Sequence, residues 1–205
     1  DTRSDDMRMI YDNILTWNKS FDRHSLEVMA GTSATTSVWE QLSGSRSYFS
    51  STNNNAIPNL NGGNNGGVRG QSYGKSEWSI MSYLARVSYN YDSKYLVTAN
   101  FRADGSSRFG IDSRWGYFPS VSAGWTLSNE PFLKDALKDV ASIRLRASWG
   151  KSGNNDIGNY SSIAGISTGS YAFGTTAVST SRLGGFADSE LGWETTTQTN
   201  IGLDL

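Results

Sequence analysis

The region from Ile80 to Gly150 alternates apolar and polar side chains with a period of two. Successive side chains of a β-strand point to opposite faces, so this pattern predicts strands with one apolar and one polar face. The short turn from Asp92 to Lys94 separates two such strands and predicts an antiparallel hairpin. The apolar positions of this hairpin are Tyr83, Ala85, Val87, Tyr89 and Tyr91, then Tyr95, Val97, Ala99, Phe101 and Ala103.

Other parts of the chain carry the same two-faced pattern, and a compact helical turn is expected over residues 130–139. Together they indicate an all-β, antiparallel sheet of about seven or eight strands. The further strands are predicted over residues 8–17, 24–31, 117–129, 141–150 and 193–205.

Two long polar segments, residues 32–75 and 151–192, are rich in Gly, Ser and Asn and are expected to be loops. The second leaves open one extra strand near residues 170–178. Long connections alternate with short ones along the chain, and neighbouring antiparallel strands reverse direction. The long loops therefore share one end of the sheet and the compact turns share the other, which is typical of outer-membrane barrels.

Two folds explain such strands: a soluble β-sandwich and a transmembrane β-barrel. Strands of about 10 residues match the length that crosses a bilayer at a tilt, whereas sandwich strands usually have about 5–6. Aromatic residues flank the strand ends, with Tyr91 and Tyr95 at the compact turn and Trp115 and Tyr117 at the opposite end. These groups indicate interfacial girdles and favour the barrel. A carbohydrate-binding or adhesin-type sandwich is the alternative.

Arginine recurs at mid-strand on the polar face. In a sandwich these side chains would face solvent, and in a barrel they line an aqueous lumen. The predicted lumen-lining residues are Arg86, Asn100, Arg102, Arg144 and Arg146.

Composition excludes several kinds of chemistry. The net charge of −1 and the scattered lysines and arginines argue against a nucleic-acid partner, and the absence of cysteine excludes thiolate chemistry. His24 is the single histidine, so no catalytic set is predicted. The glycine-rich residues 62–70 lack the Lys-Ser/Thr ending of a phosphate loop, and no spacing of carboxylates predicts a metal site or a cofactor. A hydrolase has only scattered carboxylates in its favour.

Two further groups are candidates for contacts in or near the loops. Asp104, Arg108 and Arg114 flank a strand exit and are predicted to form a structural ionic cluster. Aromatic side chains in the long loops are candidates for stacking on a ligand or contacting a lid protein, with loop packing as the alternative. They are Trp39, Tyr48, Phe49, Tyr171 and Phe173.

Several colinear segments resemble the barrel of the SusC/RagA family of TonB-dependent outer-membrane transporters. The turn Asn18-Lys19-Ser20-Phe21 also fits that family, and the resemblance extends over nearly the whole chain outside the two long loops. The segments are residues 103–110 (ADGSSRFG), 114–125 (RWGYFPSVSAGW), 128–132 (SNEPF), 143–150 (IRLRASWG) and 193–203 (WETTTQTNIGL).

The resemblance implies an outer-membrane barrel of about 22 strands with a plugged lumen. It also implies import of oligosaccharides or peptides, a SusD-like surface lipoprotein as lid, and energy from the TonB complex. The chain shows no plug domain and no TonB-contacting segment, so residues 1–205 are expected to be part of the barrel wall of a longer polypeptide. Such a segment contacts outer-membrane lipid, the rest of the barrel and the plug.

Overall fold

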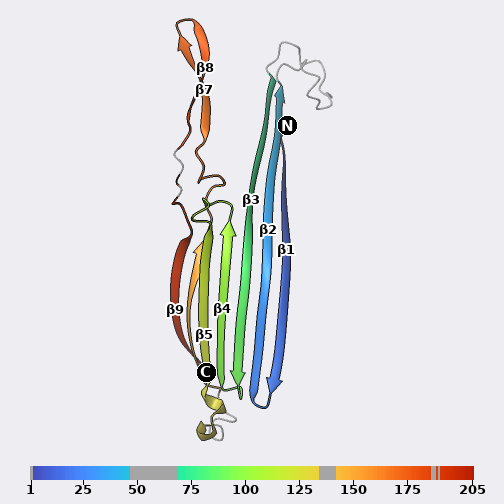
Figure 1. The fold of residues 1–205 in the computed structure, drawn as a ribbon, viewed down its shortest axis with the longest axis vertical. Helices are drawn as coiled ribbons and strands as arrows, with labels where there is room; N and C mark the ends of the chain where they lie inside the picture. The colour runs from blue at the N-terminus through green and yellow to red at the C-terminus, as the bar shows by residue number, and fades with distance from the viewer. Residues whose placement is uncertain (1, 47–68, 134–141, 186–187, 189) are drawn as a thin grey trace, which may run out of the picture. The chain divides into compact units, whose positions relative to one another are not determined.

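The computed structural model describes residues 2–46, 69–133, 142–185, 188 and 190–205. Most of them form a seven-stranded sheet with the order β1-β2-β3-β4-β5-β6-β9 (Figure 1). The strands from β3 to β6, and β9, pair antiparallel. The strands are β1 (Thr2–Phe21), β2 (His24–Arg46), β3 (Arg69–Tyr91), β4 (Tyr95–Ser106), β5 (Trp115–Thr126), β6 (Arg144–Asn154), β7 (Ile166–Phe173), β8 (Thr176–Leu183) and β9 (Glu194–Asp204).

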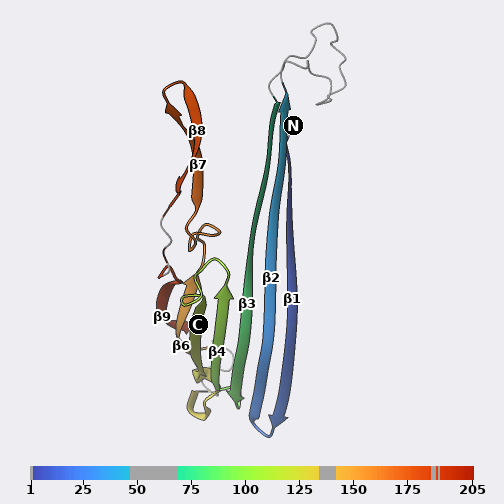
Figure 2. The ribbon, with the colours of Figure 1, turned by 45° about the horizontal axis from the view of Figure 1, so that its top comes forward.

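Strands β7 and β8 pair with one another in a second, two-stranded sheet (Figure 2). Their turn contains Gly174 at a φ of 61°, a left-handed conformation that favours glycine. A backbone hydrogen bond from Gly184 to Gly165 closes the base of this hairpin at 2.7 Å. The extra strand left open near residues 170–178 is thus a complete hairpin.

The chain divides into two compact units. The first contains residues 1–9 and 36–78, and its described side chains are largely polar or charged. In this unit Ser37 donates a hydrogen bond to Asp6 at 3.4 Å, and the guanidinium of Arg8 lies 5.6 Å from the centroid of the Trp78 ring. Lys75 forms ion pairs in the same unit, at 3.3 Å with Glu77.

The second unit contains residues 10–35 and 79–205 and keeps the two faces of its strands in register. Val87 of β3 lies opposite Ala99 of β4, which lies opposite Val121 of β5. One residue along, Arg86 lies opposite Asn100. Because the register places apolar residues opposite apolar ones and polar residues opposite polar ones, the sheet has a continuous apolar face and a continuous polar face.

The apolar face is the more exposed of the two. Val87 and Phe101 expose 44% and 46% of their surface, whereas Ser82 on the polar face exposes 2%. Among the described residues, the buried apolar side chains are Ala103, Phe109 and Phe118, near the end of the sheet opposite the turn from Asp92 to Lys94. A β-sandwich buries its apolar face against a second sheet, and this sheet does not.

The strands are longer than the sequence pattern predicts. Residues 32–46 and 69–75 were expected to be loop but belong to β2 and β3, so that prediction is wrong. Both faces of these extensions are rich in Thr, Ser and Gly, which removes the apolar alternation, while backbone pairing with neighbouring strands still satisfies their polar groups. Similarly, β6 continues to Asn154, beyond the predicted end at Gly150.

The connection after β5 begins with a 3-10 turn, η2 (Leu127–Asn129), and residues 131–133 start a helical turn. The remainder of the helical turn predicted over residues 130–139 lies outside the described residues. No helix in the described part of the chain has the length and apolar character needed to span a membrane.

Candidate functional site

Hydrogen bonds cross from strand to strand along the polar face. The Nε of Arg86 donates to Oδ1 of Asn100 at 2.8 Å, and Nδ2 of Asn100 donates to the hydroxyl of Ser120 at 3.2 Å. Arg102 donates to both carboxylate oxygens of Asp104, at 2.8 and 2.7 Å. The polar side chains of three strands are therefore fixed by one another.

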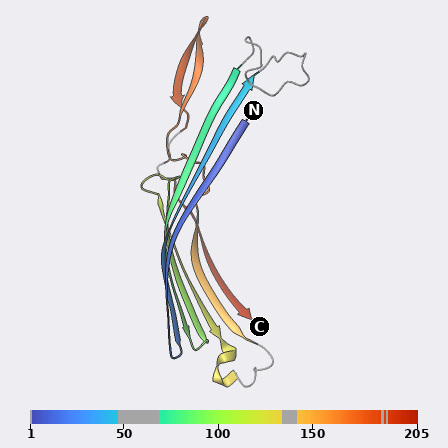
Figure 3. The same ribbon diagram turned by 90° about the vertical axis from the view of Figure 1, so that its right-hand side faces the viewer.

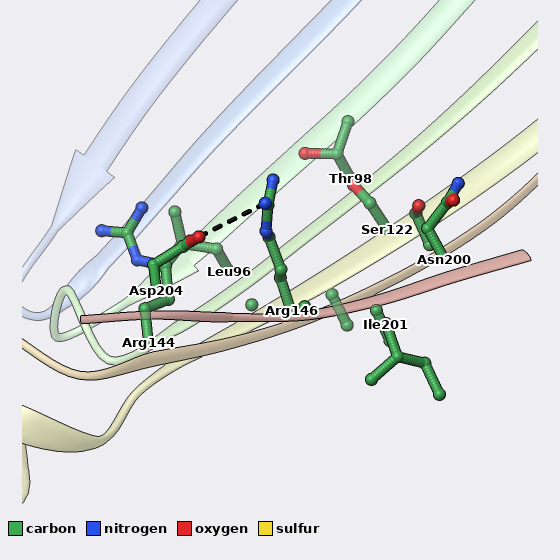
Figure 4. Close-up of a pocket in the computed structure, with 13 residues that line it drawn as sticks. Leu96, Thr98, Ser122, Arg144, Arg146, Asn200, Ile201 and Asp204 are labelled. Carbon is green, nitrogen blue, oxygen red and sulfur yellow. Dashed lines mark ion pairs between the residues drawn. The ribbon is translucent and has the colours of Figure 1, made fainter.

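A pocket of about 690 Å³ opens on this face over β4, β5, β6 and β9 (Figure 4). Small residues form its floor, because Ser122, Gly124, Ser148 and Gly202 lie at polar-face positions of adjacent strands. The longer side chains that line it are Leu96, Thr98, Arg144, Arg146, Asn200 and Asp204.

Two arginines dominate the electrostatics of the pocket. Arg146 lies across Gly202, where a Cβ atom would approach its Nε to 2.7 Å, and its Nη2 is 3.3 Å from Oδ1 of Asp204. Arg144 donates from Nε to the hydroxyl of Thr126 at 3.3 Å. The pocket can therefore offer guanidinium nitrogens to an anionic group.

All five predicted lumen-lining residues lie on the polar face, but they do not form one site. Arg86 joins Asn100, Arg102 joins Asp104, and only Arg144 and Arg146 line the pocket. Asn200 and Asp204 also line the pocket and were not among the predicted residues. The period-two pattern of residues 193–205 could have found them, since they alternate with the apolar positions of that segment.

Asp104, Arg108 and Arg114 lie at the same end of the sheet, with partners other than those predicted. Asp104 pairs with Arg102. Arg108 donates to the Asn159 side chain at 2.8 Å and pairs with Asp156 at 3.3 Å. Arg114 contributes its backbone carbonyl oxygen, which accepts from the indole of Trp193 at 2.9 Å. The Arg108 guanidinium thus bridges two connections, and the three residues do not close one turn with each other.

The loops at this end surround a small core, which we call the loop core: Phe109, Phe118 and Trp193. The Trp193 ring lies 5.4 Å from the ring of Phe109 and 5.1 Å from that of Phe118. Gly116 and Gly153 leave room for these rings, since a Cβ atom at either position would overlap Phe118. The loop core therefore joins the connection after β4 and the connection before β9 to strand β5.

The compact turns lie together at the other end of this unit (Figure 3). The backbone N–H of Asp92 donates to the carbonyl of Arg23 at 2.7 Å, which joins the β1–β2 and β3–β4 turns. Lys94 pairs with Asp92 at 3.1 Å and with Glu130 at 3.6 Å, which joins the β3–β4 turn to the connection after β5. We call this chain of contacts the compact rim.

Aromatic rings follow the compact rim from strand to strand. His24 stacks on Phe21 with 4.9 Å between ring centroids and lies 4.9 Å from Tyr91. Tyr91, Tyr95 and Trp125 continue the row with spacings of 6.3 Å. Nδ1 of His24 is 2.6 Å from the hydroxyl of Tyr89, so the single histidine has a structural place in this row.

Glu130 is the buried acceptor of the compact rim. It accepts from the Tyr95 hydroxyl at 2.6 Å and the Trp125 indole at 3.1 Å. These hydrogen bonds, with the charge of Lys94, hold the pKa of the Glu130 carboxyl below its usual range.

A lowered pKa in the folded state predicts a stabilising contribution that is present above the ordinary pKa and lost as the pH falls through the folded value. We therefore expect Glu130→Gln to lower the unfolding temperature of the full-length parent at pH 7, and the difference from wild type to shrink in acid. Thermal unfolding at neutral pH and below the ordinary value of 4.5 measures this. Glu190→Gln, at an exposed position, is the control; equal effects of the two variants would contradict the role of Glu130.

The candidate loop aromatics lie in different surroundings. Trp39 belongs to β2, and its ring would be 3.5 Å from a Cβ atom at Gly74 of β3. Tyr171 and Phe173 are exposed on β7 and contact one another edge to face, with ring centroids 5.1 Å apart. Tyr48 and Phe49 lie outside the described residues. Within the described part of the chain, no group of three His, Cys, Asp or Glu side chains is placed to hold a metal ion.

Comparison with known proteins identifies the family. Residues 1–205 match the model of the TonB dependent receptor-like β-barrel. The chain therefore belongs to this family, and its strands are part of an antiparallel transmembrane β-barrel. The sequence-based fold class and the resemblance to SusC/RagA transporters are confirmed.

The similar proteins support the same assignment. The chain is 35% identical over 195 residues to TonB-dependent receptor P39 of Formosa agariphila. This match covers 95% of this chain and 18% of the relative. It is 41% identical over 132 residues to the TonB-dependent receptor SusC of Bacteroides thetaiotaomicron, over 62% of this chain and 13% of SusC. The chain thus spans less than a fifth of these relatives.

Solved structures share the fold. The structure of the RagAB peptide importer in the open-open state matches with a TM-score of 0.85 at 24% identity, over 98% of this chain and 22% of the matched chain. The closed-closed state matches with a TM-score of 0.84 at 23% identity, over the same shares.

Proposed function

We propose that residues 1–205 form consecutive strands in the barrel wall of a TonB-dependent outer-membrane importer. The apolar face contacts lipid, and the polar face lines the lumen. The long connections face the cell exterior, and the compact rim faces the periplasm. This segment helps a solute to pass through the barrel and does not make or break covalent bonds.

The inverted exposure of the sheet carries this proposal. Apolar side chains such as Val87 and Phe101 are open to their surroundings, while the polar face is held by cross-strand hydrogen bonds. Water opposes this arrangement, because exposed apolar area is unfavourable there. A bilayer favours it, since lipid covers the apolar face and the lumen hydrates the polar one.

The proposal extends to partners and substrate through the relatives. A longer polypeptide supplies the remaining strands and the plug, and the TonB complex supplies energy. A SusD-like surface lipoprotein covers the external end. The cargo is an oligosaccharide or a peptide, the latter in keeping with the RagAB peptide importer that shares the fold. Exposed Tyr171 and Phe173 on the β7–β8 hairpin are candidates for contact with that lid or cargo.

Cell fractionation and uptake test this function together. We expect the full-length parent in the outer-membrane fraction, and we expect deletion of its gene to abolish energy-dependent uptake of one labelled oligosaccharide or peptide from a panel. The isolated chain should not be monomeric in water without detergent, because its apolar face would be exposed. A soluble, monomeric chain with a cooperative thermal transition would favour the β-sandwich alternative and contradict the barrel wall.

A further inference from the structure

The polar-face pocket holds more positive than negative charge. Among the described residues that line it, Arg144 and Arg146 supply two guanidinium groups, and Asp204 supplies one carboxylate. Arg146 forms an ion pair with this carboxylate at 3.3 Å. Arg144 has a neutral partner, the hydroxyl of Thr126, and forms no ion pair with a carboxylate in the described part of the chain.

The remaining donors of Arg144 are available to a ligand. Its Nε is occupied by Thr126, which leaves the two terminal nitrogens of the planar guanidinium. Figure 4 shows the Arg144 side chain on the same side of the strands as Arg146 and Asp204. The amide of Asn200 and the hydroxyls of Thr98 and Ser122 line the same pocket.

The floor leaves space for a ligand group above the strands. Gly124 and Gly202 carry no side chain, and Ser122 and Ser148 carry short ones. The resulting volume of about 690 Å³ accommodates a side chain or a small organic acid. Cross-strand pairing fixes Arg144 opposite Asp204 and Arg146 opposite Gly202, so the donors are held on a paired sheet.

The charge balance selects the class of anion. A guanidinium binds a carboxylate or a phosphate through two parallel hydrogen bonds. A phosphate with nearly two negative charges would also meet Asp204 in the same pocket, and Asp204 already forms an ion pair with Arg146. Two guanidinium groups and one carboxylate leave the pocket with one net positive charge, which one further negative charge neutralises, and this favours a carboxylate over a doubly charged phosphate.

We propose that Arg144 binds a carboxylate group in this pocket, with Asn200 and the neighbouring hydroxyls as further polar contacts. The inference rests on the proposed function, because it takes the polar face to line the lumen. The carboxylate comes either from an acidic side chain elsewhere in the parent polypeptide or from an acidic solute in the lumen.

Two measurements on the purified full-length parent separate these sources, with Arg144→Gln as the variant. An internal carboxylate predicts that the variant lowers the unfolding temperature in the absence of solute, and that 1 M salt reduces this difference. A solute carboxylate predicts an unchanged unfolding temperature and contact of butyrate, but not of neutral butyramide, with the wild type in saturation-transfer NMR. Butyrate binding should then weaken about tenfold or more in the variant.

Arg86→Gln is the matched control, because Arg86 is a polar-face arginine outside the pocket whose described partner is the neutral Asn100. It should leave butyrate contact unchanged, and it should lower the unfolding temperature less than an internal-carboxylate Arg144→Gln variant does. Unchanged stability and unchanged butyrate contact in Arg144→Gln would overturn the site, and so would equal effects of the two variants. Should Arg144→Gln fail to assemble, Arg144→Lys must assemble, since it keeps the charge; failure of both would assign Arg144 a packing role and overturn the carboxylate site. Assembly of the wild-type parent in the outer membrane reports separately on the proposed function.

Discussion

Replacing Phe109 with alanine is expected to lower the free energy of unfolding of the parent by about 3–5 kcal/mol, the usual cost of truncating a buried phenylalanine. Phe109 exposes 1% of its surface and packs against Trp193. The loop core joins two connections that are far apart in the sequence to strand β5, so loss of this ring leaves a cavity between them. Urea-induced unfolding of the parent in detergent measures the change.

Phe132→Ala is the control for this experiment, because Phe132 exposes 70% of its surface. It should change the unfolding free energy by less than about 0.5 kcal/mol, as surface substitutions usually do. Increased proteolysis of residues 155–165 in Phe109→Ala alone would show that the loop core holds the connection to the β7–β8 hairpin. Equal stability of the two variants would show that the loop core does not contribute to folding.

Polar contacts beside the loop core also depend on the folded chain. Arg108 and Asn155 are 47 positions apart, yet Nη1 of Arg108 donates to the carbonyl of Asn155 at 3.0 Å. The Asn155 amide in turn donates to the fully buried hydroxyl of Ser106. Proximity in the sequence suggested a cluster of Asp104, Arg108 and Arg114. The actual partners of Arg108 follow β6 in the sequence and reach it only when β6 pairs with β5, so the sequence alone did not indicate them.

The central hairpin was predictable from the sequence for a physical reason. Period-two alternation from Tyr83 to Ala103 and a turn at Asp92 to Lys94 leave one register that keeps both faces continuous. The structure has that register, with Tyr91 opposite Tyr95 and Val87 opposite Ala99. The same argument identified the apolar and polar faces of β5, β6 and β9.

The ends of β2 and β3 were not predictable in this way. Residues 32–46 contain many Thr and Ser on both faces, and a strand that is polar on both faces carries no alternation signal. These extensions form because their backbones pair with neighbouring strands. Such pairing depends on the partner strand and leaves no local pattern in the sequence of the extension itself. The β7–β8 hairpin was missed in part for the same reason, since its residues are mostly small and polar.

The candidate site was half predictable. The alternation placed Arg144 and Arg146 on the polar face, but their partners depend on strand order. β9 pairs with β6 although β7 and β8 intervene in the sequence, and this pairing brings Asp204 to Arg146. The floor of the pocket likewise depends on Gly124 and Gly202 lying on either side of Arg146 in adjacent strands.

The central claim is that the apolar face contacts lipid, and a charge placed on either face of one strand tests it most directly. Val87→Arg puts a guanidinium among exposed apolar side chains, opposite Ala99. The cost expected for arginine facing lipid near the bilayer midplane is about 2–4 kcal/mol, because the charge loses its hydration there.

Ser88→Arg is the matched variant, since it adds the same side chain one residue later on the polar face. It removes the 3.2 Å hydrogen bond between Ser88 and Thr98, which contributes about 0.5–1.5 kcal/mol, and its charge stays hydrated in the lumen. The measurement is the folded, outer-membrane fraction of the full-length parent and its unfolding free energy. We predict a marked loss of assembled protein for Val87→Arg and near wild-type assembly for Ser88→Arg. Equal assembly of the two variants, or a greater loss for Ser88→Arg, would contradict the assignment of the two faces.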